Sequence, residues 1–99
     1  MTDTIQLLEA LRQLLPLLSE RYHVESLGVF GSYVRQEQTP DSDLDILVTF
    51  YEPPSLLKFI EIENFLTDRL GVKVDLVMKD ALKPIIKKNV LREVVEIKT

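Results

Sequence analysis

The sequence has no cysteine and only one histidine among its 99 residues. Without cysteine the chain can form neither a disulfide framework nor a thiolate nucleophile, and this composition favours a reducing compartment. The single histidine, His23, cannot by itself build a histidine-rich metal site or a Ser-His-Asp triad, so we assign it no role. The composition thus excludes disulfide-stabilised folds, thiol chemistry and catalysis by a histidine cluster.

Long hydrophobic runs are absent as well. No apolar stretch approaches the length of a membrane-spanning helix, which needs about 20 residues. Asp3 and Glu9 lie among the first leucines and no basic leader is present, so we expect no signal peptide. These absences predict a cytoplasmic protein without a membrane partner.

Negative charge dominates, but it is unevenly distributed. The net charge is −4, and because residues 79–99 contain six Lys and Arg against three acids, residues 1–78 carry −7. Binding to a phosphate backbone needs a basic face, so we expect no direct nucleic-acid partner. An acidic body remains compatible with a nucleotide bound as its metal complex. With 45% hydrophobic and 28% charged residues, the sequence predicts one small globular domain.

The hydrophobic pattern predicts alternating helices and strands. Leucines at helical spacing define a first helix, which Pro16 should kink or break. A later helix has Ser55 as its N-cap and Gly71 just past its C-terminus. Asp80 is expected to cap a further helix that has Pro84 in its first turn. We predict helices over 4–21, 32–37 and 56–70, strands over 24–30, 43–50 and 72–78, and either helix or strand over 94–97.

Two of these predicted elements have unusual composition. The helix over 56–70 is apolar on more than one side, which indicates burial on two sides or contact with a partner. Gly28 lies inside the first predicted strand, where glycine indicates a bulge or a close backbone approach. The leucines of the first helix, in contrast, are assigned to the core.

Two carboxylates begin the second predicted strand. Because side chains alternate along a strand, Asp43 and Asp45 point to one side while Leu44 points into the core. The next β-α-β unit has the length of a parallel crossover, so Asp75, early in the third strand, should lie beside Asp45. Neighbouring carboxylates repel each other unless a cation lies between them, and Mg²⁺ prefers oxygen ligands. The aspartates therefore predict a metal site.

The turn formed by Gly31 and Ser32 is expected next to these acids. If the first two strands pair antiparallel, the end of the first strand lies beside Asp43 at the start of the second. Gly31 allows close backbone approach to a ligand, and the short helix after it offers unpaired N–H groups. With the Ser32 hydroxyl and with Arg35 one turn further on, this turn is suited to holding a triphosphate.

A calcium loop is the rival interpretation of the acidic stretch. Asp41, Asp43, Asp45 and Glu52 match four positions of an EF-hand loop. The sixth position of that loop requires glycine for a sharp turn, and here it is Ile46. The residues after Ile46 continue as a strand, so we reject an EF-hand.

These motifs together resemble those of the nucleotidyltransferase superfamily related to DNA polymerase β, above all its minimal members, the MNT-type antitoxins. The matching residues are Gly31 and Ser32, then Asp43 and Asp45 after ten intervening residues, and Asp75 on a later strand. Arg35 matches the arginine common after the turn, whereas Gln36 stands where close relatives often have glycine. The resemblance covers nearly the whole chain. It implies a single nucleotidyltransferase domain over residues 1–99 with an α/β (α+β) fold, a small mixed β-sheet with helices packed mainly on one face.

The resemblance also implies a chemistry for the site. Asp43 and Asp45 would bind Mg²⁺, with two ions implied, and Asp75 would be the third acid of the catalytic and metal-binding set. Asp75 would position or deprotonate the attacking hydroxyl. Gly31 and Ser32 would bind the phosphates of ATP, and pyrophosphate would leave.

The resemblance also implies a partner protein. Many minimal nucleotidyltransferases resemble the antitoxin of a pair whose toxin is a HEPN-domain ribonuclease, and AMP transfer from ATP to a toxin tyrosine is the proposed reaction. This implies a hetero-oligomer with a HEPN-type toxin. Two alternatives stay open, an antitoxin that neutralises by binding alone and a small-molecule nucleotidyltransferase of the aminoglycoside-modifying kind.

Overall fold

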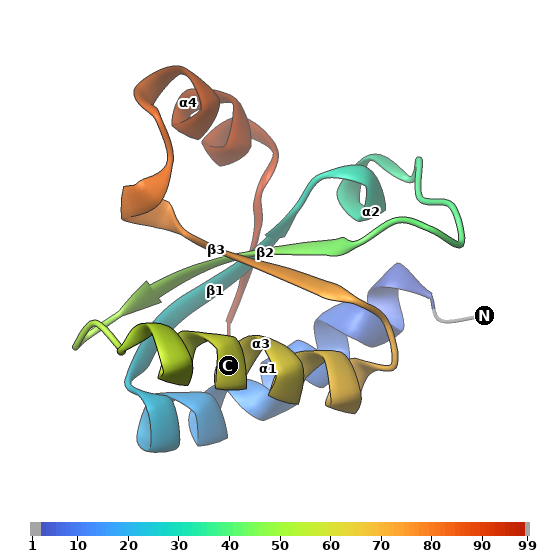
Figure 1. The fold of residues 1–99 in the computed structure, drawn as a ribbon. Helices are drawn as coiled ribbons and strands as arrows, with labels where there is room; N and C mark the ends of the chain where they lie inside the picture. The colour runs from blue at the N-terminus through green and yellow to red at the C-terminus, as the bar shows by residue number, and fades with distance from the viewer. Residues whose placement is uncertain (1–2, 99) are drawn as a thin grey trace.

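The computed structural model describes residues 3–98 and contains one four-stranded sheet with helices around it (Figure 1). In chain order the elements are α1 (Thr4–Tyr22), β1 (Val24–Phe30), α2 (Ser32–Arg35), β2 (Leu44–Phe50), α3 (Leu56–Leu70), β3 (Val74–Met78), the 3₁₀ turn η1 (Lys79–Ala81), α4 (Pro84–Glu93) and β4 (Val95–Ile97). The strand order is β3-β2-β1-β4; β2 and β3 are parallel, and β1 is antiparallel to β2 and β4. The predicted mixed sheet is confirmed.

The two long helices, α1 and α3, cover one face of the sheet, whereas α2 and α4 lie on the other side (Figure 1). The hydrophobic core shared by these helices and the sheet includes Leu7, Leu11 and Leu18 of α1, Ile62, Leu66 and Leu70 of α3, and Leu44, Ile46 and Val48 of β2. Full burial of a leucine or isoleucine stabilises the fold by about 1.5–3 kcal/mol. Because side chains alternate along β2, the core residues place Asp45 on the face away from α1 and α3. Within residues 3–98, no helix combines the length and hydropathy needed to cross a bilayer.

The boundaries of α3 match the predicted range 56–70, because local signals set both ends. The Ser55 hydroxyl accepts a hydrogen bond from the N–H of Lys58 at 3.1 Å, which satisfies one free donor of the first turn. Gly71 ends the helix with φ 73°, and its N–H donates to the Thr67 carbonyl. The predicted cap and the predicted C-terminal glycine are both confirmed.

Two helix details were predicted wrongly. Pro16 was predicted to kink or break the first helix; α1 continues through Pro16, which is exposed, so there is no break there. Proline removes a single backbone bond there, and the buried leucines on both sides of it stabilise the continuous helix. Asp80 is not a cap of α4, since it lies in η1 and Lys83 is the N-cap residue. Pro84 does occupy the first turn, as predicted.

The strands also differ slightly from the predicted ranges, since β2 begins at Leu44 and β3 at Val74. Gly28 marks a close approach: a β-carbon there would lie 2.5 Å from Val94 Cγ2. The register shift in β1 lies between Val24 and Ser26, not at Gly28. Within the undecided segment 94–97, residues Val95–Ile97 form the short edge strand β4, which pairs with β1.

Strand β3 is the other edge of the sheet, and α3 satisfies part of its backbone. The Val74 N–H donates to the Thr67 hydroxyl at 3.1 Å, and the Leu76 N–H donates to the Glu63 carboxylate at 2.8 Å. These side chains accept hydrogen bonds from backbone N–H groups that would otherwise be unpaired on an edge strand. They fix β3 against α3 and thereby fix Asp75, which lies between the two donors.

Candidate active site

Asp45 and Asp75 lie side by side on the parallel strands β2 and β3. The strand register pairs Asp45 with Asp75 directly. Residues in register on neighbouring strands point to the same face, so both carboxylates meet on the face opposite α1 and α3. Asp43 lies just before β2, where the Leu44 N–H donates to the Lys73 carbonyl at 2.8 Å. This bond fixes the start of β2, and Asp43 with it, beside the start of β3.

Gly31 brings the end of β1 against the same acid. Phe30 is opposite Asp45 in the antiparallel pair β1–β2, and Gly31 follows with φ 84°. A β-carbon at Gly31 would overlap Oδ2 of Asp45. A residue with a side chain would therefore have to displace either the backbone or the carboxylate. Ser32, which is half-buried, follows as the first residue of α2. The turn was predicted to lie next to Asp43; the structure places Gly31 against Asp45, two residues further along the same acidic segment.

The carboxylates affect each other's ionisation. Partial burial, reinforced by the negative charges of Asp75 and Asp43, raises the pKa of the Asp45 carboxyl from 3.8 to about 6. A cation among these acids would remove the repulsion and favour the ionised form. Asp45 and Asp43 are half-buried and Asp75 is exposed, so the site is open to solvent on the β3 side.

A complete metal shell is not present in the protein alone. Among residues 3–98, no three His, Cys, Asp or Glu side chains are gathered so as to hold a metal ion by themselves. Mg²⁺ does not require such a shell, because it is usually bound by one or two carboxylates together with water and substrate phosphates. The raised pKa of Asp45 reflects, besides partial burial, the negative charge of Asp75 and Asp43 next to it. The donor set thus fits Mg²⁺ that enters with a nucleotide.

Arg35 is paired with carboxylates of its own. Its guanidinium donates to both oxygens of Glu93 at 2.9 Å and to Glu37 at 3.2 Å. The hydrogen bonds that Arg35 donates to Glu37 and Glu93 raise its pKa above the ordinary value. Glu93 also accepts a hydrogen bond from the Gly31 N–H at 3.1 Å. Sequence reasoning missed Glu93, because it is 58 residues from Arg35 and no local pattern marks the contact.

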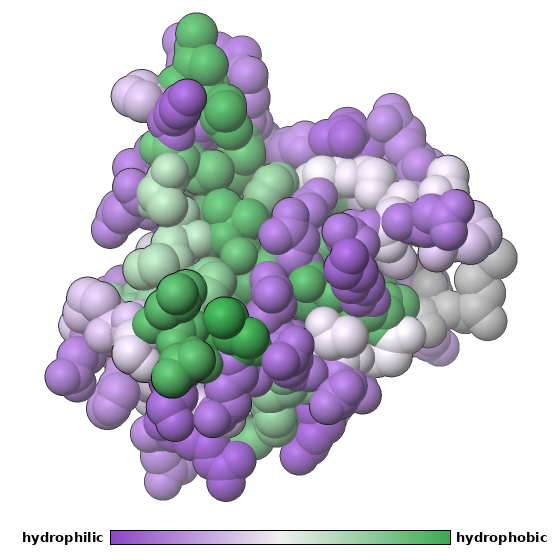
Figure 2. Space-filling model, in the orientation of Figure 1, coloured by the Kyte–Doolittle hydropathy of each residue, from purple (hydrophilic) through white to green (hydrophobic). Residues whose placement is uncertain are grey.

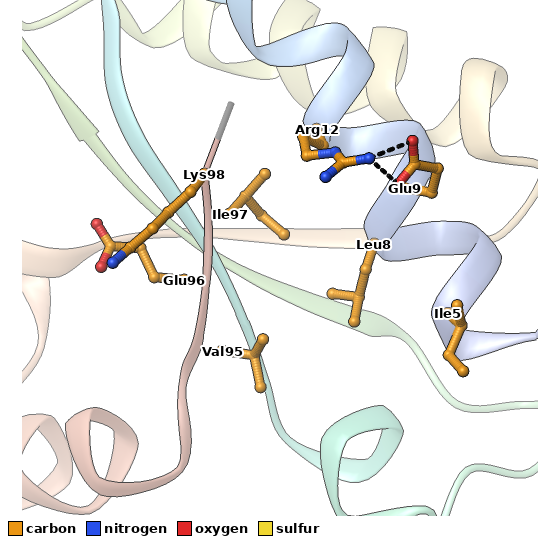
Figure 3. A pocket seen from close by; sticks show the side chains of 8 residues that line it. All are labelled: Ile5, Leu8, Glu9, Arg12, Val95, Glu96, Ile97 and Lys98. Atoms are coloured by element: carbon orange, nitrogen blue, oxygen red, sulfur yellow. Dashed lines mark hydrogen bonds and ion pairs between the residues drawn. The ribbon is translucent and has the colours of Figure 1, made fainter.

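One surface cavity opens at the acidic residues and another lies elsewhere. The first, of about 380 Å³, is lined by Tyr33, Pro40, Asp41, Ser42, Asp43, Gly71, Val72 and Lys73. The second, of about 330 Å³, lies between α1 and β4, where Arg12 pairs with Glu9 (Figure 3). None of the predicted site residues lines this second cavity. The space beside Asp43 is the candidate substrate cavity, because an acid of the predicted site lines it.

Acids in register on two parallel strands, with a Gly-Ser turn against one of them, define a site of the nucleotidyltransferase class. The family model for the nucleotidyltransferase domain matches residues 7–97. The match spans most of the chain, and the protein belongs to this family. The sequence-based assignment to the nucleotidyltransferases is confirmed.

Relatives place the chain among the small members of the family. The protein adenylyltransferase MntA of Thermococcus cleftensis is 64% identical over 78 residues, which cover 79% of this chain and 79% of the relative. A solved structure provisionally named a minimal nucleotidyltransferase has a TM-score of 0.79 and 38% identity and covers 95% of both chains. A chain from the complex of tri-AMPylated HEPN toxin with MNT antitoxin from Shewanella oneidensis has a TM-score of 0.70. That match is 19% identical over 96% of this chain and 71% of the other, so it concerns the fold alone.

Proposed function

We propose that this protein is a Mg²⁺-dependent protein adenylyltransferase, the antitoxin of a HEPN/MNT pair, which transfers AMP from ATP to a tyrosine hydroxyl of its toxin. The observation that carries the proposal is the register of Asp45 with Asp75 beside the Gly31 turn. The 64% identity to a protein adenylyltransferase supports a protein as the acceptor. Exposed apolar side chains on α3, Leu56 and Leu57 above all, support a partner surface.

Each site residue has a separate part in this proposal. Asp43 and Asp45 would hold Mg²⁺, which when bound stabilises negative charge on the attacking and leaving oxygens. Gly31 and Ser32 would donate hydrogen bonds from the turn to the β- and γ-phosphates. Arg35 would add positive charge next to them. The cavity beside Asp43 would hold part of the nucleotide.

Asp75 would act on the acceptor. The tyrosine oxygen attacks the α-phosphorus of ATP, the bond from this phosphorus to the oxygen bridging to the β-phosphate breaks, and pyrophosphate leaves. Asp75 takes the phenolic proton as the new oxygen–phosphorus bond forms. Asp75 is exposed on the edge strand β3, and such a position is accessible to a side chain presented by a large protein.

The test is label transfer to a purified HEPN-type partner from the same organism, using Mg²⁺ and ATP labelled at the α-phosphate. We expect label on the partner with the wild-type protein and its loss with Asp43→Asn, with Asp45→Asn or after removal of Mg²⁺ by EDTA. Glu20→Gln is the matched control, because Glu20 is an exposed acid of α1 that lies outside the predicted set and does not line the cavity beside Asp43. Mass spectrometry of the labelled partner identifies the acceptor residue.

The outcomes separate the three candidate functions. Transfer at the wild-type rate by Asp43→Asn would show that the proposal is wrong. Neutralisation of the toxin without label, unaffected by Asp43→Asn, would favour an antitoxin that acts by binding alone. Label on small hydroxyl compounds, with none on the partner, would favour the small-molecule nucleotidyltransferase.

A further inference from the structure

Glu93 places a carboxylate at the Gly31 turn from far along the chain. It is the last residue of α4 and accepts three hydrogen bonds, one from the Gly31 N–H at 3.1 Å and two from the Arg35 guanidinium at 2.9 Å. Its side chain is 26% exposed, so solvent screens these contacts only in part. A carboxylate held by a guanidinium and a backbone N–H is a charge-assisted arrangement, stronger than neutral hydrogen bonds.

The donors that hold Glu93 are those that the proposed function gives to the nucleotide. Gly31 and Arg35 would bind phosphate oxygens in the nucleotide complex, yet in the structure both donate to one glutamate. A triphosphate brought to these donors would meet the Glu93 charge at hydrogen-bonding distance, where like charges repel strongly. The Glu93 carboxylate and the nucleotide phosphate therefore compete for the same hydrogen-bond donors.

The attachment of α4 permits such a displacement. Val90 is its only residue described as buried in the structure of residues 3–98, and Figure 1 shows α4 standing apart from the layer formed by α1 and α3. The chain just after Glu93 is held by the pairing of β4 with β1, so the displacement concerns the free end of α4 and the Glu93 side chain. A glutamate can also leave by rotation of its own side chain, without movement of the helix.

We infer that Glu93 is an internal substitute for the nucleotide phosphates, which occupies Gly31 and Arg35 in the free protein and lowers the affinity for ATP. This inference rests on the proposed function, because it assumes that the triphosphate binds at the turn. The apparent affinity of a nucleotide falls by the fraction of molecules in which the donors are free. Glu93 then sets the nucleotide concentration at which the protein is loaded.

The test is the affinity for the Mg²⁺ complex of AMP-PNP, measured by isothermal titration calorimetry. Glu93→Gln keeps the size of the side chain and removes its charge, so we expect roughly two- to tenfold tighter binding than in the wild type. Glu96→Gln is the matched control. Glu96 is an exposed acid of β4, and no hydrogen bond described for residues 3–98 joins it to Gly31 or Arg35. It changes the net charge equally, so we expect wild-type affinity.

A second measurement uses the wild-type protein and does not depend on the folding of a variant. The ¹³C shift of the Glu93 carboxylate reports its hydrogen bonds, and we expect it to change as AMP-PNP with Mg²⁺ saturates the protein. An unchanged shift, or equal or weaker binding by Glu93→Gln, would overturn the inference and leave the proposed function standing. Failure of AMP-PNP to bind all three proteins would overturn the proposed function and this inference with it.

Discussion

Asp45 is the residue at which partial burial and charge repulsion coincide, and its pKa is raised to about 6. Because this pKa lies above the unfolded value, the folded protein binds the proton more tightly than the unfolded chain does. The resulting stability is fully present below the ordinary value of 3.8 and is lost as the pH rises through about 6. We expect Asp45→Asn to stabilise the metal-free protein above pH 7 by about 1 kcal/mol, after allowance for solvent screening.

Urea unfolding in EDTA at pH 4 and pH 8 measures this effect. Asp45→Asn should raise the free energy of unfolding at pH 8. At pH 4 the increase should be small, because the wild-type carboxyl is largely protonated there. Asp41→Asn removes the same charge from an exposed position and controls for net charge. An equal increase in the free energy of unfolding at both pH values would contradict the electrostatic explanation.

Substitutions at Gly31 and Gly71 distinguish the cost of backbone strain from the cost of a collision with the Asp45 carboxylate. Both have positive φ, 84° and 73°, but an added β-carbon overlaps Asp45 at Gly31 and meets nothing within 4 Å at Gly71. Gly71→Ala should lower the free energy of unfolding by about 1 kcal/mol through backbone strain alone. Gly31→Ala should cost about 1–3 kcal/mol more, because the carboxylate must move, and should weaken AMP-PNP binding. Chemical denaturation of both variants checks this, and equal losses would show that the contact with Asp45 is unimportant.

The acids of the site could be predicted because each step depended on local rules. Alternation along a strand and a β-α-β connection were enough to bring Asp45 to Asp75. An antiparallel pair was enough to bring Gly31 to the acidic segment, although the predicted neighbour was Asp43 and the observed one is Asp45. Their catalytic and metal-binding roles remain predictions. Glu93 could not be found this way, because its contact with the turn depends on how α4 packs and on the pairing of β4 with β1, which the sequence left undecided.

At the scale of elements, local sequence signals predicted both ends of helix α3 correctly, whereas a local signal in α1 did not predict the course of that helix. Ser55 and Gly71 give α3 a start and an end that depend on nothing distant. Pro16 gave an equally clear local signal, but packing of α1 against the sheet outweighed it. Tertiary burial of several leucines exceeds the roughly 3 kcal/mol that an interior proline costs. Sequence reasoning is therefore most accurate where an end of an element is solvent-exposed.

The cap of α3 gives a prediction for this element. Ser55→Ala removes the acceptor for the Lys58 N–H and should lower the free energy of unfolding by about 1 kcal/mol. Ser55→Asp retains an acceptor and should keep nearly wild-type stability. Thermal and urea denaturation compare the two variants, and AMP-PNP binding should be unchanged in both, because neither alters the residues at the turn. If Ser55→Asp lowered the free energy of unfolding as much as Ser55→Ala does, the Ser55 hydroxyl would have a role other than capping.

At the scale of the whole molecule, one face exposes apolar side chains along two helices (Figure 2). Leu56 and Leu57 of α3 are 74% and 81% exposed, and Ile85 of α4 is 77% exposed. Beside the start of α3 lies a cavity of about 370 Å³, lined by Pro54, Ser55, Leu56, Phe59, Leu76, Val77, Met78 and Ala81. Contiguous apolar surface of this kind marks an interaction site more often than it marks chance exposure. The lining includes strand β3, which also carries Asp75.

A charge placed on this surface should therefore separate partner binding from folding and from nucleotide binding. Leu57→Glu puts an unpaired carboxylate into an apolar contact and should weaken binding of the proposed HEPN-type partner at least about tenfold. Stability should change by less than about 0.5 kcal/mol, because the side chain is already exposed. Ile5→Glu is the control, since Ile5 is 72% exposed on α1, beside the cavity between α1 and β4. Calorimetric titration with the partner gives both affinities. Equal affinity of the two variants would place the interface elsewhere, and loss of AMP-PNP binding by Leu57→Glu would show that the substitution acts through the active site.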